Sequence, residues 1–241
     1  MKNINFNDFK KVFKGRKIFI TGHTGFKGSW LSFILHEMGA EVTGFALPPK
    51  NNLNNFDLLD LKNKINHIIG DITDYNFLNK KIRENNPEII FHLAAQAIVK
   101  VSYEDTLETL NTNIIGSANL LESVKNLKNI KTLIYITSDK CYENIEKNEG
   151  YVENDLLGGS DPYSASKAAA EIVYSSYYRS FLINKINFGS ATARAGNVIG
   201  GGDWSDNRII PDCIRSILQK KPLILRNPNS TRPWQHVLEP L

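Results

Sequence analysis

The sequence of 241 residues predicts an α/β fold, a doubly wound parallel sheet with helices on both faces. Two observations predict this fold. Short apolar runs alternate with longer amphipathic stretches along most of the chain, and the first apolar run leads directly into a glycine-rich turn that opens a helix. No repeat or low-complexity linker interrupts the alternation, so we expect one main core.

The expected strands follow one another in chain order, and helices fill most of the gaps between them. The longest helices are expected at residues 107–124 and 162–181, and the second opens with Asp161-Pro162, a cap residue followed by proline at the first helical position. Residues 51–63 are predicted to be irregular. Strands are expected at residues 17–21, 41–45, 67–70, 89–93, 132–137, 188–193 and, near the end, 223–225.

Composition and charge exclude several classes of protein. The formal net charge of +4 is spread over the chain without a concentrated basic tract, so no nucleic acid partner is expected. Residues 1–17 are polar and lysine-rich, which is unlike a signal peptide, and no apolar stretch is long enough to span a membrane. Cys141 and Cys213 lie too far apart for a CxxC pair, and no metal site is predicted. We therefore expect a cytoplasmic protein with reduced thiols.

The glycine-rich turn after the first expected strand, Thr21-Gly22-His23-Thr24-Gly25-Phe26-Lys27-Gly28, is typical of a phosphate-binding turn in a Rossmann-type fold. Gly22 permits the tight turn, Gly25 lets the backbone approach a pyrophosphate, and Gly28 allows close packing of the helix. The unpaired N–H groups at the start of that helix would bind the anion. The turn therefore predicts a dinucleotide site.

Tyr163 and Lys167 stand four residues apart in an expected helix, so both side chains project from one face. A neighbouring ammonium favours ionisation of a phenol, which makes Tyr163 a candidate base near neutral pH. Ser138, just after an expected buried strand, would hold a sugar hydroxyl beside this pair. Together these residues predict a catalytic site next to the dinucleotide.

Asp139 and Lys140 follow Ser138 and supply a further acid and base that a simple reductase or epimerase does not need. Dehydration of a hexose needs both, because oxidation at C4 acidifies the C5 proton and the C6 hydroxyl must leave as water. Asp139 is the candidate acid and Lys140 the candidate base, which requires partial burial of the two side chains. The competing interpretation is a solvent-exposed ion pair on a loop.

With its GxxGxxG spacing, the chain resembles the extended branch of the short-chain dehydrogenase/reductase superfamily. The resemblance implies that Phe26 contacts the cofactor beside the three glycines, and that Asp71 and Ile72 lie at the adenine. It also places Leu93, Ala94 and Ala95 at the end of the fourth strand, next to the cofactor. The residues after the second strand include neither an acidic side chain nor an arginine, so the choice of NAD over NADP depends on the resemblance.

Four longer segments resemble the CDP-glucose 4,6-dehydratases, namely residues 21–31, 137–144, 193–204 and 232–241. The resemblance implies that Tyr163 removes the C4 hydroxyl proton, that Lys167 orients the cofactor ribose, and that Lys140 and Asp139 eliminate water from C5 and C6. It also implies that Asn197 and Arg232 bind the diphosphate of CDP-glucose. The product would be CDP-4-keto-6-deoxyglucose, a precursor of deoxysugars in surface polysaccharides such as lipopolysaccharide.

Two regions and an assembly are expected on the same basis. Residues 1–190 would form the NAD-binding domain with the catalytic residues, and residues 191–241 the beginning of a smaller substrate domain that is incomplete. The resemblance further implies a homodimer formed through the two long helices, 107–124 and 162–181. Two alternatives remain open, namely another nucleotide-sugar dehydratase or epimerase of the same fold, and an NAD-binding module without turnover.

Overall fold

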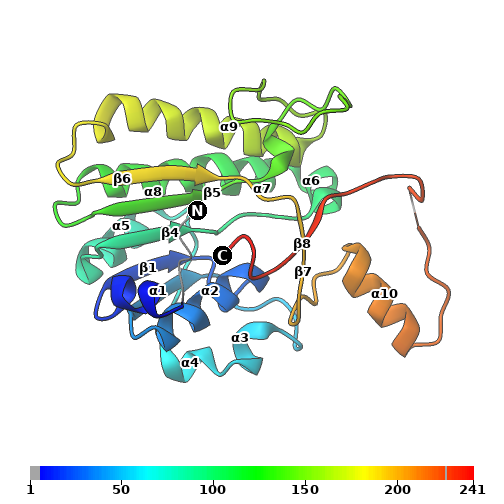
Figure 1. Ribbon diagram of the computed structural model, residues 1–241, viewed down its shortest axis with the longest axis horizontal. Helices are drawn as coiled ribbons and strands as arrows, with labels where there is room; N and C mark the ends of the chain where they lie inside the picture. Colours follow the sequence, from blue (N-terminus) through cyan, green and yellow to red (C-terminus); the bar gives the residue numbers. More distant parts are fainter. Residues whose placement is uncertain (1–5, 226) are drawn as a thin grey trace.

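The computed structural model describes residues 6–225 and 227–241, and its centre is a six-stranded parallel sheet (Figure 1). The strand order is β3-β2-β1-β4-β5-β6, so the chain reverses its direction of travel across the sheet between β1 and β4. In such sheets ligands bind at the carboxyl ends of the strands, beside this reversal. The predicted fold class is confirmed.

The sheet strands are β1 (Lys17–Thr21), β2 (Glu41–Ala46), β3 (Asn66–Ile69), β4 (Ile89–His92), β5 (Thr132–Ile136) and β6 (Gly189–Ala193). A separate two-stranded parallel sheet pairs β7 (Asn197–Ile199) with β8 (Trp234–His236). The α-helices are α1 (Phe6–Phe13), α2 (Phe26–Glu37), α3 (Asn55–Leu58), α4 (Leu61–Lys64), α5 (Tyr75–Asn85), α6 (Val99–Glu104), α7 (Thr106–Leu110), α8 (Ser117–Lys125), α9 (Pro162–Tyr177) and α10 (Ile209–Leu218).

Two apolar clusters cover the two faces of the sheet, because neighbouring residues of a strand point to opposite sides. Phe19 of β1 joins side chains of α5, α8 and α9, whereas Ile18 and Ile20 of the same strand join those of α2, α3 and α4. All three strand side chains are fully buried. Figure 1 shows α9 and α8 on one side of the sheet and α2, α3 and α4 on the other.

The two long predicted helices are present, each with a wider π-helical segment. The first consists of α7, a π-helical turn η1 (Asn111–Gly116) and α8, and the second consists of α9 followed by the π-helical turn η3 (Tyr178–Leu182). The predicted cap is also present, since the Asp161 carboxylate accepts a hydrogen bond from the Ser164 N–H at 3.0 Å. Helix α9 is therefore fixed at its first turn, next to the catalytic candidates.

Two predicted elements differ from the structure. Residues 223–225 form no strand; they are exposed and pair with no strand of the described residues, so their apolar run alone was a misleading signal. Residues 51–63, predicted to be irregular, contain α3 and α4, because Phe56 and Leu61 are buried against α2 and hold two short helices there. Within the described residues, no helix is both long and apolar enough to cross a bilayer.

Candidate active site

The glycine turn joins β1 to α2 at the carboxyl edge of the sheet, and two of its glycines are required by close contacts. Gly22 has φ +80°, and a Cβ there would lie 2.7 Å from the backbone N of Ala94, just after β4. A Cβ on Gly28 would lie 2.1 Å from the carbonyl oxygen of Gly22. These contacts account for the predicted tight turn and close helix packing.

Gly25 is exposed and is the N-cap of α2, where no side-chain cap bonds to the first turn of the helix. The first-turn N–H groups of a helix have no partner inside the helix, so they are available to an anion. Phe26 begins the helix, and its ring lies against Gly200, where a Cβ would approach it to 3.3 Å. The residues present at this turn therefore fit a bound pyrophosphate.

The remaining cofactor candidates follow the carboxyl ends of β3 and β4. Leu93 and Ala94 donate backbone hydrogen bonds to Thr21 at 3.1 and 3.2 Å, so this loop, including Ala95, closes against the end of β1. Asp71 accepts a hydrogen bond from the Thr73 N–H at 2.8 Å, an arrangement typical of a turn. The Ile72 side chain is buried in the core, and its carbonyl accepts a hydrogen bond from the Asn119 amide at 3.0 Å.

His23, also in the glycine turn, faces the protein interior and not the phosphate-binding side. Its ring lies over Gly44 of β2, and its Nε2 lies 2.6 Å from Nδ1 of His67 on β3. Burial lowers the pKa of His23 to about 3, and the neighbouring His67 adds to that effect. His23 therefore supports the turn from beneath as a neutral side chain.

Ser138, Asp139, Lys140 and Cys141 form a short turn directly after β5, which we call the 138–141 turn. The Ser138 hydroxyl donates to the Asp139 carboxylate at 2.9 Å and accepts from the Lys140 N–H at 3.2 Å. Ser138 is buried, and the side chains of Asp139 and Lys140 are half-buried. Within the part of the chain that the structure describes, Asp139 and Lys140 form no ion pair with each other, which does not favour the exposed ion-pair interpretation.

Tyr163 and Lys167 lie one turn apart at the start of α9 and are both buried, with exposed fractions of 8% and 6%. Burial lowers the pKa of Lys167 to about 8, and the charge of Lys27 adds to this effect. Burial raises the pKa of Tyr163, against the smaller opposing effects of Ser138 and Arg208. The direction for Tyr163 is opposite to our expectation, because in the protein alone the loss of hydration outweighs neighbouring positive charge.

Of the two substrate candidates, Asn197 lies on β7 of the small sheet and Arg232 lies two residues before β8. Asn197 begins β7, and its N–H donates to the carbonyl oxygen of Pro233, the residue after Arg232, at 3.0 Å. Asn197 is half-buried, whereas Arg232 is exposed and, among the described residues, donates only to the carbonyl of Thr231, at 2.7 Å. The fold thus brings the two segments together, although 35 residues separate them in the sequence.

Two buried polar residues of this edge, Asn113 and Glu171, were missed by the sequence analysis. Asn113, in the π-helical turn η1, bonds to both backbone groups of Gln96 and to Ser166 of α9, at 2.8 to 3.0 Å. Glu171 lies one turn beyond Lys167 on α9 and pairs with Arg194. The spacing Tyr163, Lys167, Glu171 was the available signal for Glu171, since residues four apart share one helix face.

Comparison with known proteins gives a consistent set of similarities. The protein family described as GDP-mannose 4,6 dehydratase matches residues 19–240. The chain is 52% identical over 237 residues to the CDP-glucose 4,6-dehydratase of Salmonella typhimurium, covering 96% of this chain and 66% of that protein. The chain therefore spans slightly less than two thirds of the length of that curated relative.

Two solved structures have the same fold. A dTDP-glucose 4,6-dehydratase from Bacillus anthracis in complex with NAD is 27% identical, with a TM-score of 0.76, and the match covers 92% of this chain and 67% of that one. A UDP-N-acetylglucosamine 4-epimerase from Methanobrevibacter ruminantium is 28% identical, with a TM-score of 0.78, covering 93% of this chain and 70% of that one. Dehydratases and epimerases therefore share this fold, so the fold alone does not distinguish between the two activities.

Proposed function

Because this chain belongs to the family described as GDP-mannose 4,6 dehydratase, we propose that it is an NAD-dependent dehydratase that converts CDP-glucose to CDP-4-keto-6-deoxyglucose. The observation that carries the proposal is the 138–141 turn, which carries Asp139 and Lys140 and packs against α9, the helix that carries Tyr163 and Lys167. The similarity to the Salmonella enzyme supports the choice of CDP-glucose, and the glycine turn supports a dinucleotide.

NAD would be held by the first turn of α2, with Gly25 and Phe26 at its pyrophosphate and Lys167 at its ribose. When bound, it would supply the transient oxidation, by taking a hydride from C4 of the sugar and returning one at C6. The loop of Leu93, Ala94 and Ala95 closes one side of this site against Thr21. Asp71 and Ile72 would provide the backbone that faces the adenine.

The side chains of this protein would carry out the proton transfers. Tyr163 would accept the proton of the C4 hydroxyl, which Ser138 would hold, and the Lys167 ammonium would stabilise the phenolate as it forms. Lys140 would then remove the C5 proton while Asp139 protonates the departing C6 hydroxyl, so that one water leaves and a C5–C6 double bond forms; when a hydride returns to C6, the Lys140 ammonium would give a proton back to C5. Asn197 and Arg232 would bind the diphosphate, because an amide and a guanidinium both donate to phosphate oxygens.

A homodimer formed through the two long helices is part of the same proposal. Leu107 and Ile115 on the first helix and Ile172 on α9 are exposed apolar side chains, the first being 80% exposed. Burial of such side chains against a second copy removes apolar surface from water. Sedimentation of the purified chain should give a dimer, and Ile172→Glu should convert it to monomers; a monomeric wild type would contradict this part of the proposal.

A cytoplasmic location is also proposed. Cys141 and Cys213 are both free cysteines, which agrees with a reducing compartment.

The experiment that tests the function is incubation of the purified chain with NAD and a panel of CDP-, dTDP-, GDP- and UDP-linked sugars, followed by mass spectrometry. We expect loss of one water from CDP-glucose. Loss of water from another nucleotide sugar instead would show that this other sugar, and not CDP-glucose, is the substrate. Conversion without a change of mass would indicate an epimerase. Lys140→Met should abolish water loss, whereas Lys80→Met, at a lysine on α5 whose side chain is 66% exposed, serves as the matched control.

A further inference from the structure

Arg194, the residue after β6, lies between two backbone groups that hold the 138–141 turn. The carbonyl of Ala193 accepts from the Thr137 N–H at 3.0 Å, and the carbonyl of Ala195 accepts from the Asp139 N–H at 3.2 Å. The proposed chemistry assigns Arg194 no role. Its backbone position nevertheless places it directly beside the turn that carries the acid and the base.

One side of the Arg194 guanidinium binds α9. Its Nε and Nη2 atoms each lie 2.9 Å from a carboxylate oxygen of Glu171, a two-pronged ion pair between side chains that are 16% and 4% exposed. Glu171 also accepts a hydrogen bond from the Thr137 hydroxyl, at the end of β5. Although burial alone would raise the pKa of Glu171, the bonds from Arg194 and Thr137 lower it, so the pair is ionised. Helix α9 is thereby tied to the residue before Ser138.

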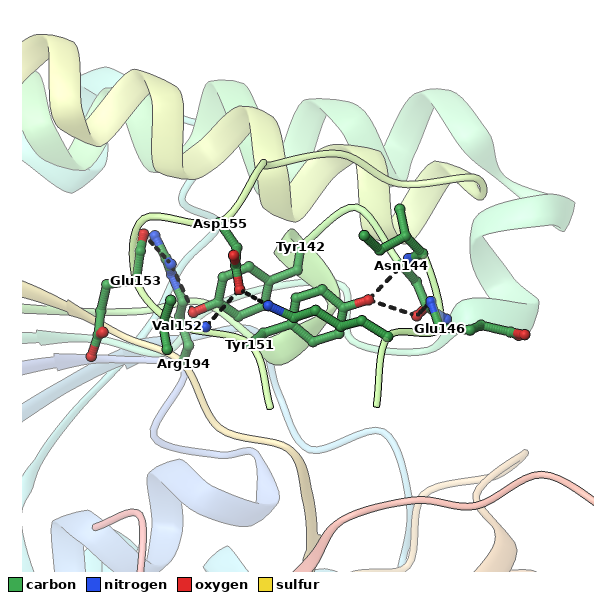
Figure 2. A network of polar contacts seen from close by, with 10 residues as sticks. Tyr142, Asn144, Glu146, Tyr151, Val152, Glu153, Asp155 and Arg194 are labelled. Atoms are coloured by element: carbon green, nitrogen blue, oxygen red, sulfur yellow. Dashed lines mark hydrogen bonds and ion pairs between the residues drawn. The ribbon is translucent and has the colours of Figure 1, made fainter. Parts of the chain in front are cut away.

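The other side of Arg194 binds the loop that follows the turn (Figure 2). Its Nη1 donates to the Tyr142 hydroxyl at 2.9 Å and to the Glu153 carbonyl at 3.2 Å, and the guanidinium lies 4.9 Å from the centre of the Tyr142 ring. Tyr142 stacks on Tyr151 at 5.2 Å, and the Lys147 amine lies 4.7 Å from the centre of the Tyr151 ring. The loop is thus held at Tyr142, the residue next to the turn.

These contacts make Arg194 a common anchor for the two halves of the proposed machinery. Tyr163 and Lys167 are carried by α9, which Arg194 holds through Glu171. Asp139 and Lys140 are carried by the turn, whose far end Arg194 holds through Tyr142. Ser138 is buried and directly follows Thr137, whereas Asp139 and Lys140 lie farther out and are half-buried. The positions of Asp139 and Lys140 therefore depend more on the contact of Arg194 with Tyr142 than on its contact with Glu171.

We propose that Arg194 is a positioning residue that fixes the Asp139–Lys140 turn relative to Tyr163 and Lys167, and that it serves water elimination more than C4 oxidation. The inference rests on the proposed function. Oxidation uses the buried Ser138 and the α9 residues, whereas elimination uses the two side chains nearest the tether. A displacement on the order of 1 Å at reacting groups can reduce a rate about 10²-fold.

Hydrogen exchange of the chain without cofactor or substrate tests the anchoring independently of activity. In Arg194→Met we expect faster exchange of the Asp139 and Glu143 amides, which bond to Ala195 and Leu156, while amides inside α9 keep their protection. The matched control is Arg16→Met, which removes an Arg–Glu pair with Glu88 at the opposite edge of the same sheet. Unchanged exchange at Asp139 and Glu143 in Arg194→Met would overturn the proposal.

Single-turnover kinetics with NAD and CDP-glucose then test the positioning. Reduction of the nicotinamide reports C4 oxidation, and mass spectrometry of quenched samples reports water loss. In Arg194→Met we expect water loss to slow about 10²-fold and oxidation less than about 10-fold, with a partial recovery in Arg194→Lys. Equal slowing of both steps would mean a purely structural role and would overturn the proposal.

Tyr142→Phe keeps the Arg194–Glu171 pair and the ring stack but removes one hydrogen bond, so it decides the question if Arg194→Met does not fold. We expect about threefold to tenfold slower water loss with unchanged oxidation; no change in either step would count against the tether. A wild-type chain that removes no water from CDP-glucose contradicts the proposed function instead, and the exchange measurement then decides the anchoring by itself.

Discussion

The carboxyl edge of the six-stranded sheet and the segment after β6 are built differently. At the sheet edge Ser138, Tyr163 and Lys167 are buried, and the ion pair of Glu171 with Arg194 is buried beside them. In the later segment Arg232 is exposed, and α10 carries Ile217 and Leu218 at 71% and 70% exposure. Figure 1 shows α10 standing away from the sheet and its helices.

This difference separates two kinds of task. Buried, hydrogen-bonded side chains keep one geometry, and positioned proton transfer requires such a fixed geometry. Exposed side chains such as Arg232 can adjust to a ligand but contribute little to the stability of the fold. We therefore expect substitutions at the sheet edge to change reaction rate or stability, and substitutions near Arg232 to change substrate binding.

The largest expected effect is that of Tyr163→Phe. Loss of the hydroxyl removes the proposed proton acceptor, so kcat with CDP-glucose should fall about 10²- to 10⁴-fold while the KM changes little. Tyr103→Phe, at a tyrosine that is 66% exposed, is the matched control. A Tyr163→Phe variant with near wild-type kcat would show that another group takes the C4 hydroxyl proton.

Gly22→Ala should have the next largest effect, on stability and on NAD binding. The positive φ at Gly22 and the contact of an added Cβ with Ala94 should together lower the free energy of unfolding by about 2–4 kcal/mol. Gly15 also has a positive φ, +70°, but a Cβ there meets no atom within 4 Å, so Gly15→Ala measures the backbone strain alone. Denaturant unfolding measures the loss of stability in both variants, and the difference between the two losses is the contribution of the contact with Ala94. Equal losses would show that this contact costs no stability.

The sequence predicted the sheet edge better than the later segment, for a physical reason. The strands β1 to β6 and the glycine turn have local signals, because alternation, apolar runs and glycine spacing are written in consecutive residues. Residues 223–225 carry a similar apolar run, yet no strand lies beside them. An apolar run indicates that its residues tend to be buried, but it does not indicate which strand or helix they would pack against.

The contacts around Arg194 could not be predicted for a related reason. Glu171 and Arg194 are 23 residues apart and lie on different elements, and Tyr142 lies in a loop. Each residue alone resembles an ordinary surface residue. His23 is a further case, because nothing in the glycine spacing indicates that its ring lies over Gly44 inside the protein.

Lys167 should make stability depend on pH at the sheet edge. Its pKa is lowered from 10.5 to about 8, so below pH ~8 the ammonium is charged in both states and the cost of burying it is fully present. Between pH ~8 and ~10 the unfolded chain binds a proton that the folded chain has lost. The free energy of unfolding should therefore rise with pH, by up to about 1.4 kcal/mol per unit.

Urea unfolding of the wild type and of Lys167→Met between pH ~7 and ~10 measures this dependence. The advantage of Lys167→Met over the wild type should shrink as the pH rises through this window. Lys100→Met, at a surface ion pair with Glu104, is the control and should run parallel to the wild type. Parallel curves for Lys167→Met as well would show that Lys167 keeps its ordinary titration in the folded chain.

The smallest expected effect is that of Arg232→Gln, which belongs to the later segment. Arg232 is exposed, and within the part of the chain that the structure describes it donates only to the neighbouring Thr231 carbonyl, so the free energy of unfolding should change by less than about 0.5 kcal/mol. A charged hydrogen bond to a phosphate contributes roughly 1.5–3 kcal/mol, so the KM for CDP-glucose should rise at least about 10-fold with kcat nearly unchanged. A fall in kcat at constant KM would contradict the separation of tasks, because it would place Arg232 with the side chains that act on the transition state.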